Sequence, residues 1–130
     1  MILIDTDICV EILKGNAGVI EMRAKTTDVV AISFMTAGEL FYGVMKSDRP
    51  ARHARVVEEF LRSVIWLNSD AQIMVKFGEL KARLALGGEL LPDADILVAA
   101  TALSKCAYLV TGNTGHFSRF SGLRLENWAR

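Results

Sequence analysis

Short runs of β-branched and aliphatic residues alternate with longer stretches of helical periodicity along the chain. Because parallel strands need a crossover helix between them, this alternation is typical of α/β proteins. The strand-like runs cover residues 2–4, 29–32, 64–67, 108–110 and 123–125. The helical patterns cover residues 6–14, 34–46, 51–63, 71–86 and 94–105. The sequence therefore predicts an α/β fold around a central parallel sheet.

The size and charge of the chain restrict both its organisation and its partners. With 130 residues, 52% of them hydrophobic, the chain suits one compact domain that spans residues 1–130. Fifteen basic and fifteen acidic residues give a net charge of zero, so any attraction for nucleic acid must be local. The longest mainly apolar run, residues 96–103, contains one polar residue, Thr101, and is too short to cross a bilayer.

Two cysteines, Cys9 and Cys106, lie inside apolar helical patterns and lack the spacing of a zinc site. Both are interpreted as small core residues. The chain also begins directly with an apolar strand and without a basic leader. We therefore expect a reduced protein in the cytoplasm, with no membrane contact.

Three acidic residues stand in the most apolar stretches of the chain. Asp5 follows the first strand-like run, Glu39 is the only charged residue in 34–45, and Asp95 precedes the apolar run 96–100. Buried carboxylates are normally paired with a base or bound to a metal, and none of these stretches contains Lys or Arg. A divalent cation is therefore the leading candidate to balance their charge.

Each acid also has a purely structural explanation. Asp5 could cap the helix that follows it, while Asp93 and Asp95 could be a cap and an acid matched to the helix dipole. Glu39 could lie on a solvent-facing stripe, although the small residues around it suggest close packing. The position of Asp5 after a strand suits function equally well, because open α/β sheets bind ligands beyond the carboxyl ends of their strands.

The remaining polar candidates are weaker. Asn113 lies in a turn after the fourth strand-like run, where it could either adopt unusual dihedrals or orient a water near a metal. His53 and His116 adjoin no recognisable nucleophile, so both are interpreted as surface or structural residues. The glycines form neither GxGxxG nor a P-loop, so no nucleotide cradle is predicted.

A basic segment occupies the helical pattern at residues 51–63 and the turn before it. Arg49, Arg52 and Arg55 would ordinarily form a solvated helix face. The alternative is local contact with phosphates, which would make nucleic-acid affinity fall with added salt.

Five short motifs follow one another from Ile2 to Trp128: LIDTDICVEILKG, TAGELFYGV, PDADILVAATAL, LVTGNTGHF and LRLENW. In order and spacing they resemble the PIN-domain ribonucleases, with the closest likeness to VapC-type toxins. The resemblance implies a three-layer α/β/α sandwich with a central, mainly parallel five-stranded sheet. It also implies that the whole chain is one nuclease domain.

The resemblance assigns roles by position. Asp5, Glu39 and Asp95 match the family's three acids and would hold Mg²⁺ or Mn²⁺ for hydrolysis of RNA. Asn113 matches a fourth polar position where many members have Asp, so its role as a direct ligand is open. The residues expected to support them through hydrogen bonds are Thr6, Asp93 and Thr111.

The resemblance further implies an RNA substrate of the tRNA or rRNA class, a cognate VapB-type antitoxin and a toxin homodimer. Two alternatives remain at this point. The first is a catalytically silent PIN-like module that binds RNA or protein. The second is a phosphoacceptor receiver domain, which should have Asp directly after its third strand, where this chain has Asn68.

Overall fold

The computed structural model describes every residue from 1 to 130. Five strands form a single sheet in the order β3-β2-β1-β4-β5, and every neighbouring pair is parallel. The strands are β1 (Ile2–Ile4), β2 (Val30–Ser33), β3 (Ile65–Leu67), β4 (Leu109–Val110) and β5 (Leu125–Glu126). The helices are α1 (Thr6–Leu13), α2 (Ala17–Lys25), α3 (Phe34–Met45), α4 (Pro50–Arg62), α5 (Ala71–Leu86), α6 (Asp93–Lys105) and α7 (Thr114–Phe117).

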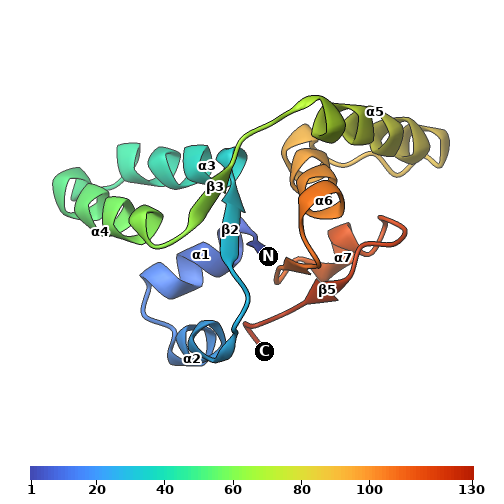
Figure 1. Ribbon diagram of the computed structural model, residues 1–130. Coiled ribbons are helices and arrows are strands. Elements are labelled where there is room, and N and C mark those ends of the chain that lie inside the picture. Colours follow the sequence, from blue (N-terminus) through green and yellow to red (C-terminus); the bar gives the residue numbers. More distant parts are fainter.

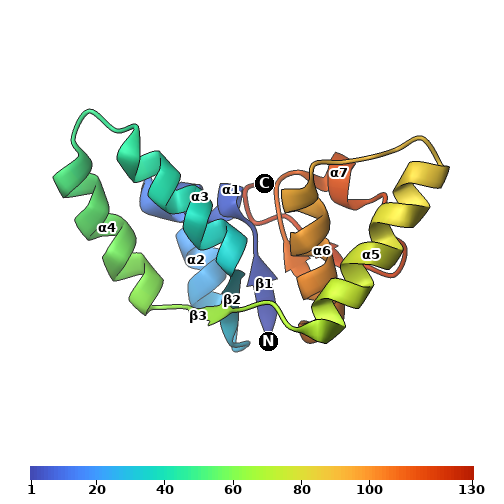
Figure 2. The ribbon, with the colours of Figure 1, turned by 90° about the horizontal axis from the view of Figure 1, so that it is seen from above.

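The sheet separates two helical layers. Helices α1 to α4 cover one face, and α5 to α7 cover the other, so that the strands lie between two groups of helices in both views (Figures 1 and 2). Strand side chains alternate between the layers: Ile2 and Ile4 belong to the core under α1 to α4, while Leu3 belongs to the core under α5 and α6. The predicted three-layer α/β/α sandwich is therefore confirmed.

The strand order places a binding crevice at one edge of the sheet. The chain runs from β1 to β2 and β3 on one side, then returns to place β4 and β5 on the other side of β1. Open α/β sheets bind ligands where the order reverses, outside the carboxyl ends of the strands. Here that point lies at the ends of β1 and β4. A receiver domain has the order 2-1-3-4-5, so that alternative is wrong.

Helix α6 is enclosed on several sides, as its uniformly apolar sequence predicted. Its residues from Ile96 to Ala102 are all buried, and it packs lengthwise against α5 (Figure 2). This burial fixes the start of the helix, and with it Asp95, at the edge of the sheet. None of the helices is both long enough and apolar enough to cross a membrane.

Two helices were not predicted from the sequence. Gly15 has a positive φ of 81° and follows the end of α1, and Asn16 caps α2 by accepting from Val19 N. Helix α2 buries only Val19 fully and has little apolar periodicity. Helix α7 has four residues, which is too short for a periodic signal.

Candidate active site

Asp5 lies at the junction of β1 and α1 and connects three elements. Its Oδ1 accepts a hydrogen bond from Thr6 N at 2.8 Å, so Asp5 is the N-cap of α1. Its Oδ2 accepts from Thr111 Oγ1 at 2.8 Å, and its backbone N donates to Val110 O at 2.9 Å. The capping role and the position at the sheet edge therefore coexist in one carboxylate.

The charge on Asp5 is poorly compensated. Burial raises the pKa of Asp5 to about 6, and the negative charges of Asp7 and Asp95 add to the effect. Hydrogen bonds from Thr111 and Thr6 act in the opposite direction but do not cancel it. No Lys or Arg forms an ion pair with Asp5. Asp5 thus lies beside two other acids and has no basic partner of its own.

Asp7 adds to this charge from the first turn of α1. Its Oδ2 accepts from Gly112 N at 2.8 Å, which ties the helix to the turn after β4. Burial raises the pKa of Asp7 as well. A Cβ at Gly112 would lie only 2.7 Å from Asp7 Oδ2, so any larger residue at this position would displace the Asp7 carboxylate.

Glu39 is exposed, and the close packing inferred from its small neighbours is wrong. A Cβ at Gly38 would meet nothing within 4 Å, so that glycine faces open space. Glu39 nevertheless faces the site, because its Oε1 lies 3.0 Å from Thr6 Oγ1. Thr6 Oγ1 is also 3.0 Å from Thr36 Oγ1, which joins α3 to the start of α1.

Asp95 occupies the first turn of α6, and its side chain is 25% exposed. Its Oδ2 lies 3.0 Å from His116 Nδ1, which is itself 2.9 Å from Asn113 Nδ2. His116 therefore contacts two of the candidate site residues, which its interpretation as a surface or structural residue did not anticipate. Sequence analysis missed it because the four-residue helix α7 that positions it had no recognisable pattern.

The polar residues after β4 link the two halves of the site. Thr111 is buried, donates to Asp5 and accepts from Asn113 N at 3.0 Å. Asn113 itself is exposed and reaches His116 through its amide. Polar contacts thus connect Asp5 through Thr111 and Asn113 to His116 and Asp95, with Nδ1 of His116 either donating to Asp95 or accepting from Asn113 according to its tautomer.

Asp93 does not join this set, so its predicted supporting role is wrong. Its Oδ1 accepts from Lys81 Nζ at 2.9 Å on the exposed surface between α5 and α6. It is also the first residue of α6, with Pro92 at the cap position, so it does not cap the helix as expected. The ion pair with Lys81 directs the carboxylate away from the sheet edge.

The donor chemistry of the site fits a hard divalent cation. Carboxylate oxygens are the ligands that Mg²⁺ and Mn²⁺ prefer, and a cation would stabilise the ionised form of Asp5, which burial and the neighbouring acids disfavour. As the side chains stand, no three His, Cys, Asp or Glu residues form a group that could hold a metal. Asp5 and Asp95 interact electrostatically, whereas Glu39 joins them through Thr6.

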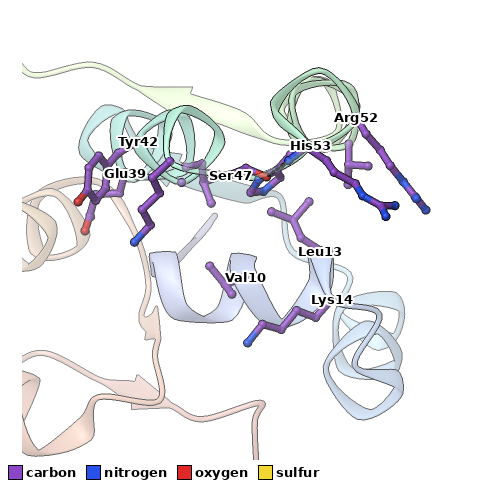
Figure 3. A pocket seen from close by; sticks show the side chains of 13 residues that line it. Val10, Leu13, Lys14, Glu39, Tyr42, Ser47, Arg52 and His53 are labelled. Carbon is purple, nitrogen blue, oxygen red and sulfur yellow. Dashed lines mark hydrogen bonds between the residues drawn. The ribbon is translucent and has the colours of Figure 1, made fainter.

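The three arginines of the basic segment separate into two groups. Arg49 and Arg52 line a groove between α1, α3 and α4, which Glu39 also lines (Figure 3). Arg55 is exposed on α4 but is not among the residues of the groove.

Comparison with known proteins identifies relatives that align along almost the whole chain. Residues 2–123 match the family described as PIN domain. A protein of Haemophilus influenzae named Ribonuclease VapC2 is 35% identical over 127 residues, which cover 97% of this chain and 96% of that protein. A protein of Shigella flexneri named tRNA(fMet)-specific endonuclease VapC is 34% identical over 128 residues, which cover 98% and 97% of the two chains.

A solved structure extends this similarity to the fold. A chain in the crystal structure of DNA-bound VapBC from Salmonella typhimurium superposes with a TM-score of 0.92 at 33% identity. The superposition covers 98% of this chain and 97% of that one. Because the chains align almost end to end, the similarity includes the strands and helices that carry the candidate site.

Proposed function

Because this chain belongs to the PIN-domain family, we propose that it is the ribonuclease toxin of a toxin–antitoxin pair and cuts RNA with Mg²⁺ or Mn²⁺. The observation that carries the proposal is the half-buried carboxylate of Asp5. It lies beside Asp7 and Asp95 at the carboxyl edge of the sheet and has no basic partner.

Asp5, Glu39 and Asp95 would hold the ion. Glu39 and Asp95 would do so through carboxylate oxygens that are not engaged by Thr6 and His116. When bound, the ion would activate a water molecule and neutralise charge on the scissile phosphate.

The surrounding polar residues keep these carboxylates in position. Thr111 and the backbone N of Thr6 fix the two oxygens of Asp5, while His116 orients Asp95. Asn113 contributes an exposed amide beside His116, from which it can donate to a substrate oxygen or a water. Loss of such a supporting hydrogen bond typically lowers metal affinity or activity by about 10- to 100-fold.

The relatives indicate the substrate and partner. The Shigella flexneri relative is named a tRNA(fMet)-specific endonuclease, so we assign RNA of the tRNA class as the substrate and keep rRNA as the alternative. The similar Salmonella typhimurium chain is part of a VapBC complex, so a VapB-type antitoxin is the expected inhibitor. A toxin–antitoxin pair of this kind acts in the cytoplasm, and we expect the toxin to form a homodimer.

Cleavage of purified tRNA in the presence of Mn²⁺, with EDTA as the metal-free control, tests the function. The wild-type chain should cleave only with the metal, and Asp5→Asn should bind RNA without cleaving it. Addition of the antitoxin should abolish cleavage. RNA binding by the wild type with no cleavage under any metal condition would contradict the proposal and favour the catalytically silent module.

A further inference from the structure

A groove of about 640 Å³ leads away from the candidate active site. It lies between α1, α3 and α4, with Glu39 at one end and Arg52 at the other (Figure 3). Val10 and Leu13 of α1 form part of its lining, opposite the side chains of α3 and α4. Because Glu39 belongs to both the groove and the site, a substrate in the groove would reach the catalytic acids directly.

The charge in this groove is strongly one-sided. Four basic residues line it, namely Lys14, Lys46, Arg49 and Arg52, and none of them forms an ion pair with an acid. Glu39 is the only acidic residue in the lining. Although the chain as a whole has a net charge of zero, these side chains make the groove locally positive, which suits an anionic ligand.

Tyr42 gives the groove a second feature. Its side chain is 66% exposed, and it lies one helical turn after Glu39 on α3. Lys46 Nζ lies 4.8 Å from the centre of its ring. Proteins that bind single-stranded nucleic acid combine cationic grooves, which follow the backbone, with aromatic side chains on which bases stack. The groove contains both features: Tyr42 lies next to Glu39, and the basic side chains line the rest of the groove.

We propose that this groove binds the single-stranded RNA segment that flanks the scissile phosphate. Lys46, Arg49 and Arg52 contact successive phosphates, with Lys14 on the opposite wall, and Tyr42 stacks on the base nearest the cut. This inference rests on the proposed ribonuclease function, which supplies the catalytic end of the path. The RNA-binding set proposed here differs from the basic segment predicted from the sequence: Arg55 is left out, and Lys14 and Lys46, which lie far apart in the sequence, are added.

The test measures RNA binding without cleavage. A fluorescein-labelled single-stranded RNA decamer is titrated with the full-length protein in EDTA, and fluorescence anisotropy gives Kd as a function of salt. The variants are Arg52→Gln and Tyr42→Ala. Arg55→Gln is the matched control, because Arg55 is exposed on the same helix but lies outside the groove.

Loss of one phosphate contact should reduce the salt slope by about 0.7 and weaken binding about fivefold at 0.1 M salt. Arg52→Gln should show both changes, and Arg55→Gln should show neither. Tyr42→Ala should weaken binding about fivefold or more with an unchanged salt slope. Both variants should still melt cooperatively near the wild-type temperature, because the replaced side chains are exposed.

Two results separate this inference from the proposed function. If the wild type cleaves tRNA but Arg52→Gln and Tyr42→Ala bind the decamer as tightly as Arg55→Gln, the groove is not the RNA path and this inference is wrong. If the wild type fails to cleave but the variants lose affinity as predicted, the groove binds single-stranded RNA and only the ribonuclease proposal falls.

Discussion

Thr111 donates a hydrogen bond from its hydroxyl to Asp5 Oδ2 across 2.8 Å, although the two residues are 106 positions apart. The contact joins the carboxyl ends of β1 and β4, the two strands between which the chain reverses its order in the sheet. Asp5 is thereby held at the place where an open α/β sheet binds its ligand. The folded chain maintains a carboxylate there even though burial and neighbouring acids disfavour its charge.

Asp5→Asn should remove the response to metal while preserving the fold. The amide keeps an acceptor for Thr6 N and can donate to Thr111, but it removes the charge that attracts a cation. In a thermal melt, 5 mM Mn²⁺ should raise the Tm of the wild type, because a ligand that binds only the folded state stabilises it. The Tm of Asp5→Asn should change little. An equal Mn²⁺ shift in both proteins would show that the ion binds elsewhere.

The same substitution should reveal the cost of the buried charge through pH. The pKa of Asp5 is raised in the folded chain to about 6 from 3.8, so the folded state binds its proton more tightly than the unfolded state. Its contribution to stability is therefore greatest below pH 3.8, decreases as the pH rises through about 6 and is constant above that value. At pH 7.5, ionised Asp5 should destabilise the fold by on the order of 2–3 kcal/mol.

Urea unfolding in EDTA measures this effect as the difference between Asp5→Asn and the wild type. Asp5→Asn should be the more stable protein at pH 7.5, and its advantage should disappear towards pH 4. The difference between the two proteins is the informative quantity, because other acids also titrate over this range. Asp70, for example, has a pKa lowered by its hydrogen bond to Lys105, so it acts with the opposite sign. A difference independent of pH would contradict the prediction.

The parts of the site that follow strands were predictable from the sequence. Asp5 and Thr111 each come directly after a strand rich in aliphatic residues, and parallel strands bring their carboxyl ends to one edge. The alternation of short aliphatic runs with helical patterns predicted the ends of the five strands to within about two residues. The hydrogen bond that Thr111 donates to Asp5 therefore follows from the order of elements, once β4 is known to pair with β1.

The parts that depend on long-range partners were not predictable. Asp93 looked like a helix cap, but Lys81 on α5 captures its carboxylate, and no local pattern connects those two residues. His116 is placed beside Asp95 by α7, a helix of only one turn that the sequence pattern did not predict. Lys14 and Lys46 are single lysines at the C-terminal ends of α1 and α3, and only the packing of these helices brings them to one groove.

Thr6→Val should disturb the link between α1 and α3. Thr6 Oγ1 is the hydrogen-bond partner of both Glu39 and the buried hydroxyl of Thr36. Valine has the same shape but leaves Thr36 without that partner, which costs about 1–3 kcal/mol. It also frees Glu39, so cleavage should fall about tenfold or more.

Thr6→Ser is the control, because it keeps the hydroxyl. Urea unfolding and tRNA cleavage should both return close to wild-type values in this variant. If Thr6→Ser were as impaired as Thr6→Val, the methyl group rather than the hydrogen bonds would be responsible, and the proposed support of Glu39 would be wrong.

His116→Ala should weaken metal binding and cleavage together. His116 Nδ1 lies between Asp95 Oδ2 and Asn113 Nδ2, so its removal frees the Asp95 carboxylate to rotate. Loss of such a supporting contact should weaken Mn²⁺ binding by about 10- to 100-fold, measured by calorimetry, with a similar loss in kcat. His116→Asn places an amide nitrogen close to the former Nδ1 position and should recover much of both losses. Phe117, which is fully buried, keeps α7 anchored in either variant, so the unfolding free energy should change little. A loss of stability without a change in Mn²⁺ affinity would instead assign His116 a purely structural role.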